Sequence, residues 1–314
     1  MFDLIIIGGA AAGSSAAIYC ARRKLNFKIV TLDTGGEVAL SGEVANWPGI
    51  LSIQGFELAQ KFTEHVKSYG VEIEEGWKVE KITSIKKHYL LTAANSSGET
   101  KEFETKSVII ATGIHPRRLT VPGEKELDRK GVTYCTVCDG PLFKNKTTVT
   151  IGSGNSALES ALMMAGIAKK VYLLSKFPNT LEQKGGFPKG ENILIEKVMA
   201  MPNIEIIYEA ITTDIIGDKK VEGIKYKDKQ GEQDLAVEGV MVHIGQIPNS
   251  QFAEKVKKNK MGEIMVDEKC RTNLRGIFAA GDVTNVAYKQ IGIAAGQGII
   301  AALATIEYIN MWKE

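Results

Sequence analysis

The pattern of a segment near the start of the chain recurs later in the sequence. Residues 2–13 read FDLIIIGGAAAG and residues 147–157 read TTVTIGSGNSA, and each is an apolar β-rich run, a glycine turn and a row of small residues. Gly8 matches Gly152 at an offset of 144 (152 − 8 = 144), and the second strands of the two segments keep the same offset. Two βαβ units at one spacing predict two nucleotide-binding domains of similar fold.

The segments around the two units predict the remaining elements. Residues 54–69 place apolar side chains at helical spacing. Residues 71–85 and 89–103 alternate between apolar and polar side chains, as strands of an antiparallel sheet do. The second unit carries its own predicted meander of strands over residues 204–242. Each domain therefore combines a nucleotide-binding core with additional antiparallel strands.

The order of these segments predicts an inserted domain. Residues 245–249 (GQIPN) are interpreted as a crossing back to the first domain, and residues 277–282 as a late strand and turn of that domain. We therefore predict an α/β protein of two Rossmann-like three-layer domains, the second inserted in the first. The expected FAD-type first domain covers residues 1–114 and 246–314, and the nicotinamide-type second domain covers residues 115–245.

Composition and charge exclude several classes of function. The length of 314 residues fits about two domains, and a net charge of +2 gives no electrostatic reason to expect nucleic acid or a membrane surface as a partner. The apolar start lacks a basic flank and a cleavage site, so we interpret it as a buried strand. Residues 291–309 contain glycines and Glu307, which favours a buried helix over a membrane span. Without an export signal, we expect a cytoplasmic protein, whose cysteines are seldom structural crosslinks.

The first glycine turn is an expected phosphate site. A helix that begins after such a turn presents free N–H groups and a positive dipole end to a pyrophosphate. Gly8 and Gly13 frame the turn, although Ala10 takes the place of the usual middle glycine. Asp33 lies 20 residues beyond Gly13 (33 − 13 = 20), where an acid meets a ribose hydroxyl. The alternative, a helix that merely packs closely on its strand, stays open.

The second glycine turn matches the dinucleotide fingerprint more closely. It has the pattern GxGxxA between a strand and a helix. The strand after it ends at Ser175 with no acid before Glu182, so a carboxylate for the NAD ribose is missing, and no arginine is present for a 2′-phosphate. Ser175 and Lys176 offer a hydroxyl and a point charge instead. The residues expected to contact this nucleotide are Gly152, Gly154, Asn155, Ser156, Ala157, Ser175 and Lys176.

Cys135 and Cys138 form a CxxC pair just before the second unit. Neither a second cysteine pair nor a paired histidine pattern completes a zinc site, so we expect no metal. A two-residue spacer lets two thiols close a small disulfide ring, and Asp139 next to Cys138 is placed to exchange a proton with a thiol. Asp139 capping a helix is the alternative. Cys20 is interpreted as a buried, inert thiol.

Together these motifs resemble the low-molecular-weight thioredoxin reductase family and its relative, the flavoprotein component of alkyl hydroperoxide reductase. The likeness covers essentially the whole chain. Residues 135–143 (CTVCDGPLF) and 261–264 (MGEI) are especially similar to the peroxidase-reductase branch. That branch carries an additional N-terminal thioredoxin-like region, which we expect to be absent here, so the resemblance implies delivery of electrons to a separate protein. The basic NADPH motif of the family is replaced by residues 175–178 (SKFP).

The resemblance implies FAD in the first domain and roles for individual residues. Residues 41–49 resemble the flavin loop of the family, Glu37 stands where a glutamine usually faces the flavin ring, and Lys289 stands where an arginine is usual. Cys138 would meet the flavin, Cys135 would attack the partner disulfide, and Asp139 would be the acid–base residue. The expected FAD contacts are Gly8, Gly13, Asp33, Gly36, Glu37, Asn46, Thr112, Gly113, Gly281, Asp282, Lys289 and Gln290.

The resemblance also implies the electron path. We expect NAD(P)H, with NADPH preferred to NADH, to reduce FAD, the dithiol and then thioredoxin or a thioredoxin-like or glutaredoxin-like protein. The inserted domain would rotate about the crossings near residues 114 and 245, so that dithiol and nicotinamide alternate at the flavin. A homodimer is usual in the family. The alternatives are reduction by ferredoxin and a small-molecule dithiol oxidase; a flavin sensor with a silent dithiol is disfavoured by the intact Cys-Cys-Asp set, and a ferredoxin:NADP reductase would lack the pair.

Overall fold

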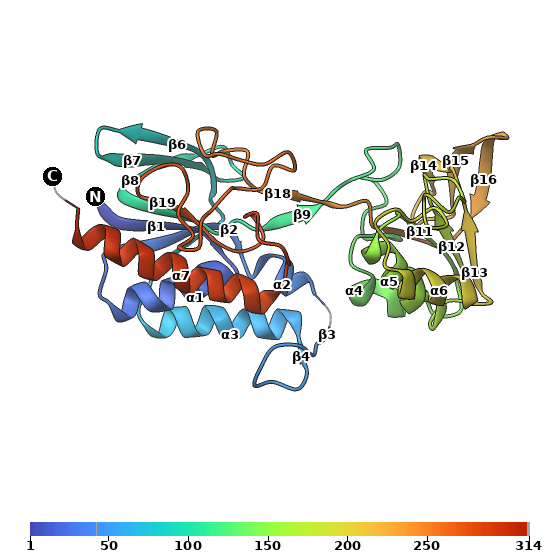
Figure 1. Cartoon of the computed structure of the whole chain (residues 1–314), viewed down its shortest axis with the longest axis horizontal. Helices are drawn as coiled ribbons and strands as arrows, with labels where there is room; N and C mark the ends of the chain where they lie inside the picture. Colours follow the sequence, from blue (N-terminus) through green and yellow to red (C-terminus); the bar gives the residue numbers. More distant parts are fainter. Residues whose placement is uncertain (42, 313–314) are drawn as a thin grey trace. The chain divides into compact units, whose positions relative to one another are not determined.

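The computed structural model describes residues 1–41 and 43–312. Contacts divide the chain into two compact units (Figure 1). The first comprises Met1–His115 with Ile247–Glu314, and the second comprises Pro116–Gln246. The chain passes between the units twice, and the two passing segments, β9 (Ile114–Pro116) and β18 (Gln246–Pro248), pair as a two-stranded sheet.

The first unit is built on a seven-stranded sheet in the order β5-β2-β1-β8-β7-β6, with β19 also paired to β8. The parallel strands are β1 (Phe2–Gly9), β2 (Phe27–Thr34), β5 (Ile73–Glu75), β8 (Thr100–Ile110) and β19 (Ile277–Ala279). Antiparallel pairing is confined to β6 (Lys78–Ile85), β7 (His88–Ala94) and β8. The antiparallel prediction for residues 71–85 is therefore wrong at its start, because β5 joins the parallel edge beside β2. A separate pair consists of β3 (Glu43–Val44) and β4 (Ile53–Gln54).

Alternation along β1 separates two apolar layers in this unit. Successive side chains of a strand point to opposite faces, so Leu4 and Ile6 pack in one buried cluster and Ile5 and Ile7 in another. The first cluster lies under the helices, which Figure 1 shows together on one side of the sheet. These helices are α1 (Ala11–Arg22), α3 (Gly55–Ser68) and α7 (Ile291–Asn310), with the short α2 (Gly36–Leu40) after β2.

Helix α7 is apolar because its inner face belongs to the core. By length and composition it passes the test for a membrane-spanning helix, as the core helices of other proteins also do. Its small residues Ala294, Gly298, Ala301 and Thr305 are buried at helical spacing. At Gly298 an added Cβ would overlap the carbonyl oxygen of Ala12 in α1, so only glycine permits this close approach of the two helices.

The second unit repeats the parallel arrangement. A five-stranded parallel sheet has the order β10-β17-β11-β12-β13, with β10 (Val132–Thr133), β11 (Thr147–Ile151), β12 (Lys170–Leu174), β13 (Ile204–Ile207) and β17 (Gly239–Val242). The meander is β14 (Ile211–Ile216), β15 (Gly223–Asp228) and β16 (Gly231–Ala236). It is shorter than predicted, because both ends of residues 204–242 join the parallel sheet. The helices are α4 (Thr136–Asp139), the 3₁₀ turn η1 (Gly140–Phe143), α5 (Asn155–Ala165) and α6 (Asn192–Ala200).

The internal repeat is a repeat of structure. Helix α1 begins at Ala11 and α5 at Asn155, again 144 residues apart (155 − 11 = 144). Gly8 and Gly152, the first glycines of the two turns, have φ angles of +111° and +152°. A Cβ at either position would meet the backbone of a neighbouring strand end, so both turns depend on glycine. The predicted fold of two Rossmann-like α/β domains is confirmed.

Candidate functional site

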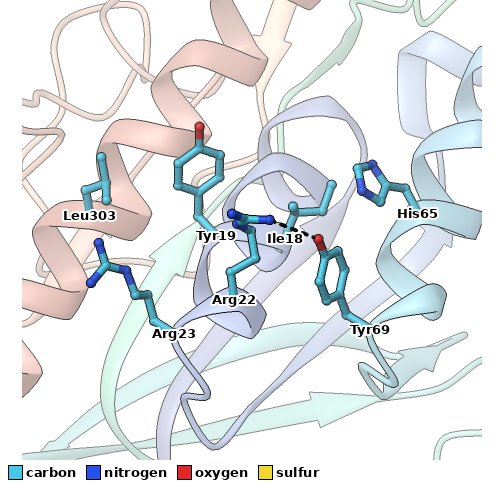
Figure 2. A pocket seen from close by; sticks show the side chains of 7 residues that line it. All are labelled: Ile18, Tyr19, Arg22, Arg23, His65, Tyr69 and Leu303. Atoms are coloured by element: carbon cyan, nitrogen blue, oxygen red, sulfur yellow. Dashed lines mark hydrogen bonds between the residues drawn. The ribbon is translucent and has the colours of Figure 1, made fainter.

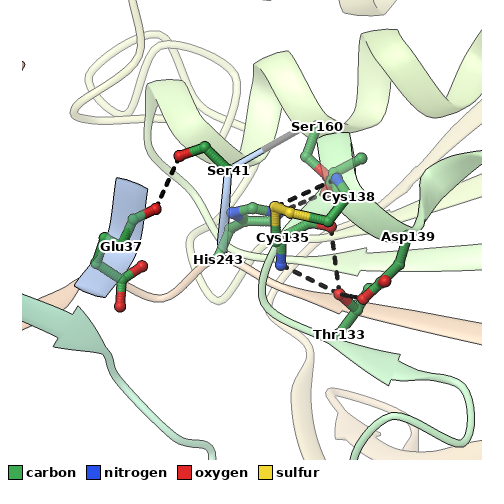
Figure 3. The surroundings of a disulfide bond; sticks show 9 residues. Glu37, Ser41, Thr133, Cys135, Cys138, Asp139, Ser160 and His243 are labelled. Atoms are coloured by element: carbon green, nitrogen blue, oxygen red, sulfur yellow. Dashed lines mark hydrogen bonds between the residues drawn. A yellow bond between two sulfur atoms is a disulfide. The ribbon is translucent and has the colours of Figure 1, made fainter. Parts of the chain in front are cut away.

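The cysteine pair forms a tight turn in the second unit. Cys135 and Cys138 are joined by a disulfide, and Cys135 is the N-cap of α4 (Figure 3). The Sγ atom of Cys135 accepts a hydrogen bond from the backbone N–H of Cys138 at 3.2 Å. The backbone N–H of Asp139 donates to the carbonyl of Cys135 at 3.1 Å. The sequence spacing therefore becomes one turn of chain that places both sulfur atoms at its start and end.

Asp139 is held beside this turn by Thr133. The hydroxyl of Thr133 donates to Oδ2 of Asp139 at 2.5 Å, and it accepts from the backbone N–H of Cys135 at 3.1 Å. Asp139 provides no side-chain cap for the turn η1 that follows it, so the helix-cap alternative is wrong. One carboxylate, one hydroxyl and the backbone of Cys135 thus form a connected polar group within reach of the disulfide.

A second polar group lies on the other side of α4, and no motif in the sequence indicates it. The hydroxyl of Thr136, between the two cysteines, lies 2.8 Å from Nε2 of His243 and 2.6 Å from Oγ of Ser160. Figure 3 shows His243 and Ser160 near the disulfide. Burial lowers the pKa of His243 to about 4, so the imidazole is neutral at neutral pH. In the sequence, His243 is notable only as a histidine that completes no zinc pattern.

The first glycine turn, where the pyrophosphate is predicted to bind, is closely packed against α1. An added Cβ at Gly13, in the first turn of α1, would overlap the carbonyl oxygen of Gly8. At the end of β2, the carboxylate of Asp33 accepts a hydrogen bond from the backbone N–H of Gly36 at 3.0 Å. This bond ties the predicted ribose acid to the start of α2. All of the predicted FAD-contact residues lie in the first unit.

Carboxylates gather at the ends of β2 and β19. Burial, reinforced by Asp33 and Asp282, raises the pKa of Glu37 above its ordinary value, against the opposing charge of His115. Burial also raises the pKa of Asp282 to about 6. One oxygen of Asp282 is buried with no hydrogen-bond partner among the described residues. A buried acceptor without a donor fits a hydroxyl-rich ligand at this position, as FAD provides.

The remaining predicted flavin residues are linked in pairs. The amide of Asn46 donates to Gln290 at 3.2 Å. Lys289 is paired with Glu263 at 2.8 Å and donates to the carbonyl of Thr284 at 2.6 Å. These contacts bring the loop after β3 to the segment before α7. The remaining positions are Thr112 and Gly113 after β8 and Gly281 after β19. Within the predicted flavin loop 41–49, Gly42 lies outside the described residues.

The crossing segments are held by Asn249 in the first unit. Its amide group donates to the carbonyl of Thr112 at 2.8 Å, and the hydroxyl of Thr112 donates to the carbonyl of Asn249 at 2.6 Å. The Oδ1 atom of Asn249 also lies 2.6 Å from Nδ1 of His115. The pair of bonds fixes the end of β8 to the returning chain, beside Gly113.

The second glycine turn is engaged by the segment that follows β12. Gly154 forms a parallel bridge with Lys189. The amide of Asn155 donates to the carboxylate of Glu191 at 2.8 Å, and its oxygen accepts from the Glu191 N–H at 2.8 Å. A pyrophosphate at this turn would therefore meet a carboxylate beside the start of α5. Of the other predicted contacts, Ser156 is exposed and Ala157 is buried.

Ser175, a predicted nucleotide contact, is engaged by the loop that follows β12. Its side chain is fully buried, and its hydroxyl donates to the carbonyl of Gly186 at 2.5 Å and accepts from the N–H of Phe177 at 3.2 Å. The hydroxyl thus shapes the loop after β12. Lys176 is exposed, with its amino group over the ring of Phe177.

The other cysteines are not part of the site. Cys20 and Cys270 are buried thiols, and burial raises their pKa values to about 12 and about 11. The interpretation of Cys20 as a buried thiol is confirmed, and its raised pKa disfavours the reactive thiolate form. Across residues 1–41 and 43–312, no group of three or more His, Cys, Asp or Glu side chains is placed to hold a metal ion.

A pocket of about 570 Å³ lies on the helical layer of the first unit (Figure 2). Arg22 donates to the hydroxyl of Tyr69 at 3.4 Å, and His65 stacks on the Tyr69 ring. The residues that line the pocket are Ile18, Tyr19, Arg22, Arg23, His65, Tyr69 and Leu303. None of these side chains is a thiol, so we do not assign the pocket to the redox site.

Two nucleotide-binding domains, one carrying a disulfide-forming cysteine pair, define the class of flavin-dependent disulfide oxidoreductases of the thioredoxin reductase type. The chain belongs to the pyridine nucleotide-disulphide oxidoreductase family, whose sequence model matches residues 2–298. Membership in this family implies FAD and a nicotinamide nucleotide as cofactors.

Two curated relatives illustrate the range of the family. The chain is 39% identical to an NADH dehydrogenase of Ferdinandcohnia aciditolerans, over 98% of this chain and 57% of that protein. It is 38% identical to a component of the alkyl hydroperoxide reductase of Escherichia coli, over 99% of this chain and 59% of that protein. The chain therefore spans somewhat more than half the length of these relatives.

Solved structures match along the whole chain. The thioredoxin reductase of Lactococcus lactis aligns with a TM-score of 0.82 at 32% identity, covering 99% of this chain and 100% of that one. The thioredoxin reductase of T. acidophilum aligns with a TM-score of 0.77 at 38% identity, covering 98% of both chains. A ferredoxin-flavin thioredoxin reductase of Clostridium acetobutylicum aligns with a TM-score of 0.53 at 28% identity, covering 99% of both chains. The resemblance to thioredoxin reductases in the sequence is confirmed by these likenesses.

Proposed function

We propose that this protein is an FAD-dependent disulfide reductase that passes electrons from NAD(P)H through the Cys135–Cys138 pair to thioredoxin or a thioredoxin-like protein. The observation that carries the proposal is the disulfide turn itself. It is closed, and the carboxylate of Asp139 lies in a bonded group with Thr133 and the backbone of Cys135. Such a turn accepts an electron pair, becomes a dithiol, and attacks another disulfide.

The residues of the first unit fit FAD, which when bound would accept an electron pair from the donor and release it to the disulfide. Gly8 and Gly13 would hold its pyrophosphate at the start of α1. Asp33 would bind the adenosine ribose, and Asp282 would accept a hydrogen bond from the ribityl–phosphate region with its unpartnered oxygen. Glu37, Lys289 and Gln290 would lie toward the flavin ring, on the resemblance to the family.

The proposed roles at the disulfide follow from the resemblance to the family. Cys135 would attack the partner disulfide, Cys138 would meet the flavin, and Asp139 would hold and return the proton of the thiol. Val137 and Leu142, close to the cysteines, are 47% and 69% exposed. Exposed apolar side chains beside a reactive sulfur support a protein as the electron acceptor. Because the dithiol and the nicotinamide both need access to the flavin, we propose that β9 and β18 act as the hinge that alternates them.

For the donor we propose NADPH in preference to NADH. Residues 175–181, directly after β12, contain no carboxylate to repel a 2′-phosphate, and the exposed Lys176 supplies positive charge there. Ser175 has no part in this, because its hydroxyl is buried in the loop. Replacing Lys176 with Glu reverses the charge at an exposed position, so it should shift the preference toward NADH by about tenfold.

Ferredoxin is the second candidate donor. The observation in its favour is the covered glycine turn, where Glu191 places a negative charge beside Asn155. Nucleotide phosphates would have to displace or tolerate that carboxylate. The structural likeness to a ferredoxin-flavin thioredoxin reductase adds to this candidate.

One experiment tests the proposed function and its donor together. The purified protein is made anaerobic and mixed in parallel with NADPH, NADH and reduced ferredoxin, and bleaching of the flavin is followed by absorbance. An oxidised thioredoxin is then added, and its dithiol is measured. We expect bleaching by NADPH and production of thioredoxin dithiol. Bleaching by ferredoxin alone would assign the donor to the second candidate, and bleaching without any disulfide reduction would refute the proposed reductase.

A further inference from the structure

His243 is placed rigidly by the sheet of the second unit. It directly follows β17, whose residues pair with both β10 and β11. Its backbone N–H donates to the carbonyl of Ile151 at 2.8 Å. Its own carbonyl lies where a Cβ on Gly152 would be, so the backbone is packed against the end of β11. The imidazole is therefore carried by a backbone position that the sheet holds in place.

The imidazole is joined to the disulfide turn by a buried chain of hydroxyls. Thr136 is only 4% exposed and lies between the two cysteines. Its hydroxyl meets Nε2 of His243 at 2.8 Å and Oγ of Ser160, in α5, at 2.6 Å. Ser160 in turn lies 3.5 Å from the hydroxyl of Thr150 in β11. These hydrogen bonds therefore connect α4 to α5 and to the ends of two strands.

These side chains act by exchanging hydrogen bonds, and none of them stores a proton for the reaction. A hydroxyl has one proton to donate and can also accept, so Thr136 can donate to His243 while accepting from Ser160, or the reverse. Both directions are satisfied by a neutral imidazole. The lowered pKa of His243, a result of burial, keeps it neutral throughout the pH range in which thiols exchange.

We propose that His243 is a positioning residue that acts through Thr136 to hold the Cys135–Cys138 turn in the geometry in which the two sulfur atoms close on each other. The proposal deepens the proposed function, on which it rests for its purpose, because it concerns the same redox pair. It assigns a role to a residue outside the CxxC motif, 107 positions along the chain from Thr136.

The consequence is a change in the balance between disulfide and dithiol. When the disulfide is reduced by glutathione, the sulfur–sulfur bond breaks, each cysteine sulfur gains one electron and one proton, and two glutathione thiols become one glutathione disulfide. The dithiol turn is then held by its hydrogen bonds alone. In the absence of His243, the Thr136 hydroxyl keeps Ser160 but loses its second partner. The dithiol turn can relax so that the hydroxyl reaches water, whereas the closed disulfide holds it buried with that second hydrogen bond unmade. Losing His243 therefore disfavours the disulfide more than the dithiol.

The test is a redox equilibrium of the full-length, flavin-loaded protein with glutathione buffers. Acid quenching and alkylation then count the thiols by mass. In His243→Ala and in Thr136→Val, we expect the equilibrium constant for forming the disulfide to fall about tenfold, equivalent to about 30 mV for two electrons. His243→Gln, whose amide can both donate and accept, should restore the constant to within about twofold of the parent. The double variant should have an equilibrium constant no lower than that of either single variant, because both changes break the same set of hydrogen bonds.

Thr148→Val is the matched control. Thr148 lies in β11 and is fully buried, and its hydroxyl has no partner in the part of the chain described. Its loss should leave the equilibrium unchanged. A parent-like constant in Thr136→Val overturns the proposal, whatever His243→Ala does, and so does a His243→Gln protein that folds but behaves like His243→Ala. The measurement needs no nicotinamide, ferredoxin or thioredoxin, so it stands or falls separately from the proposed reductase activity.

Discussion

The hydroxyl of Thr133 donates a hydrogen bond to the carboxylate of Asp139 across 2.5 Å, and the same hydroxyl accepts one from the backbone of Cys135. Thr133 is 4% exposed, at the end of β10, so its position is set by the parallel sheet. The proposed acid–base residue is therefore aimed by a strand and does not depend on its own short helix. A hydrogen bond from a neutral hydroxyl to a carboxylate at this distance is a strong orienting contact.

Removing that hydroxyl should slow the exchange of disulfides. Thr133→Val keeps the volume of the side chain but leaves Asp139 without its donor. We expect kcat for reduction of a protein disulfide to fall about tenfold, because one charge-assisted hydrogen bond is lost. Flavin reduction by the donor should be unchanged in stopped-flow absorbance. Thr148→Val serves as the control, and equal kcat values for Thr133→Val and the parent would show that Asp139 needs no such positioning.

The two cysteine variants should differ in the species that accumulates. Cys135→Ser and Cys138→Ser should each abolish reduction of a protein disulfide while the donor still reduces the flavin. In Cys138→Ser the remaining thiol attacks the partner but has no neighbour to release it, so a mixed disulfide should accumulate. Non-reducing electrophoresis with oxidised thioredoxin detects it. Turnover at the parent rate in Cys138→Ser would contradict the assignment of the pair.

Gly13→Ala should lose flavin without losing the fold of the second unit. The added Cβ would overlap the carbonyl of Gly8, so the turn must open where the pyrophosphate is proposed to bind. We expect the purified parent to be yellow with about one FAD per chain, and the variant to carry several-fold less. Absorbance at the flavin band against total protein measures it. Gly296→Ala is the control, because open space surrounds an added Cβ at that position of α7. A colourless parent that takes up no added FAD would refute the flavin site.

Asp282 should make the flavin-free protein less stable as the pH rises. Its folded pKa of about 6 lies above the ordinary value of 3.8, so folding disfavours the ionised form. The contribution of Asp282 to the free energy of unfolding is complete below pH 3.8 and is lost as the pH rises through 6. The difference between the two pKa values amounts to about 3 kcal/mol. Flavin-free Asp282→Asn should therefore resist urea better than the parent at pH 7 and equally at pH 4, while binding FAD less well. Asp218→Asn, at an exposed position, is the control. Equal urea midpoints at pH 7 would show that burial does not disfavour the carboxylate.

Much of the architecture can be predicted from the sequence because it is local. A strand that alternates two buried faces, a glycine turn and a helix of small residues each leave a pattern within about ten neighbouring positions. The offset of 144 residues then repeats that pattern, and the structure places α1 and α5 at this offset. The prediction for the start of residues 71–85 is wrong because pairing direction is not local. The residues of β5 alternate in the same way whether they lie beside β2 or beside β6, and in the fold they lie beside β2.

The roles of single polar side chains depend on distant partners. Ser175 directly follows β12, where a nucleotide contact is expected, but the loop after it folds back so that the carbonyl of Gly186 accepts a hydrogen bond from its hydroxyl. Nothing within either segment signals that bond. The amide of Asn155 is likewise taken by Glu191, 36 positions away. Hydrogen-bond partners of this kind are selected by packing, after the backbone has been placed.

The amino-acid sequence alone determined the two nucleotide-binding units, the glycines on which their turns depend and the cysteine pair, because spacing along the chain is enough to specify each of them. Only the tertiary structure decided what surrounds the pair. It brought Thr133 to Asp139 and carried His243 across 107 positions to Thr136. The physical reason is that a buried polar group must find a partner wherever the core closes, and closure of the core joins residues that no local pattern relates.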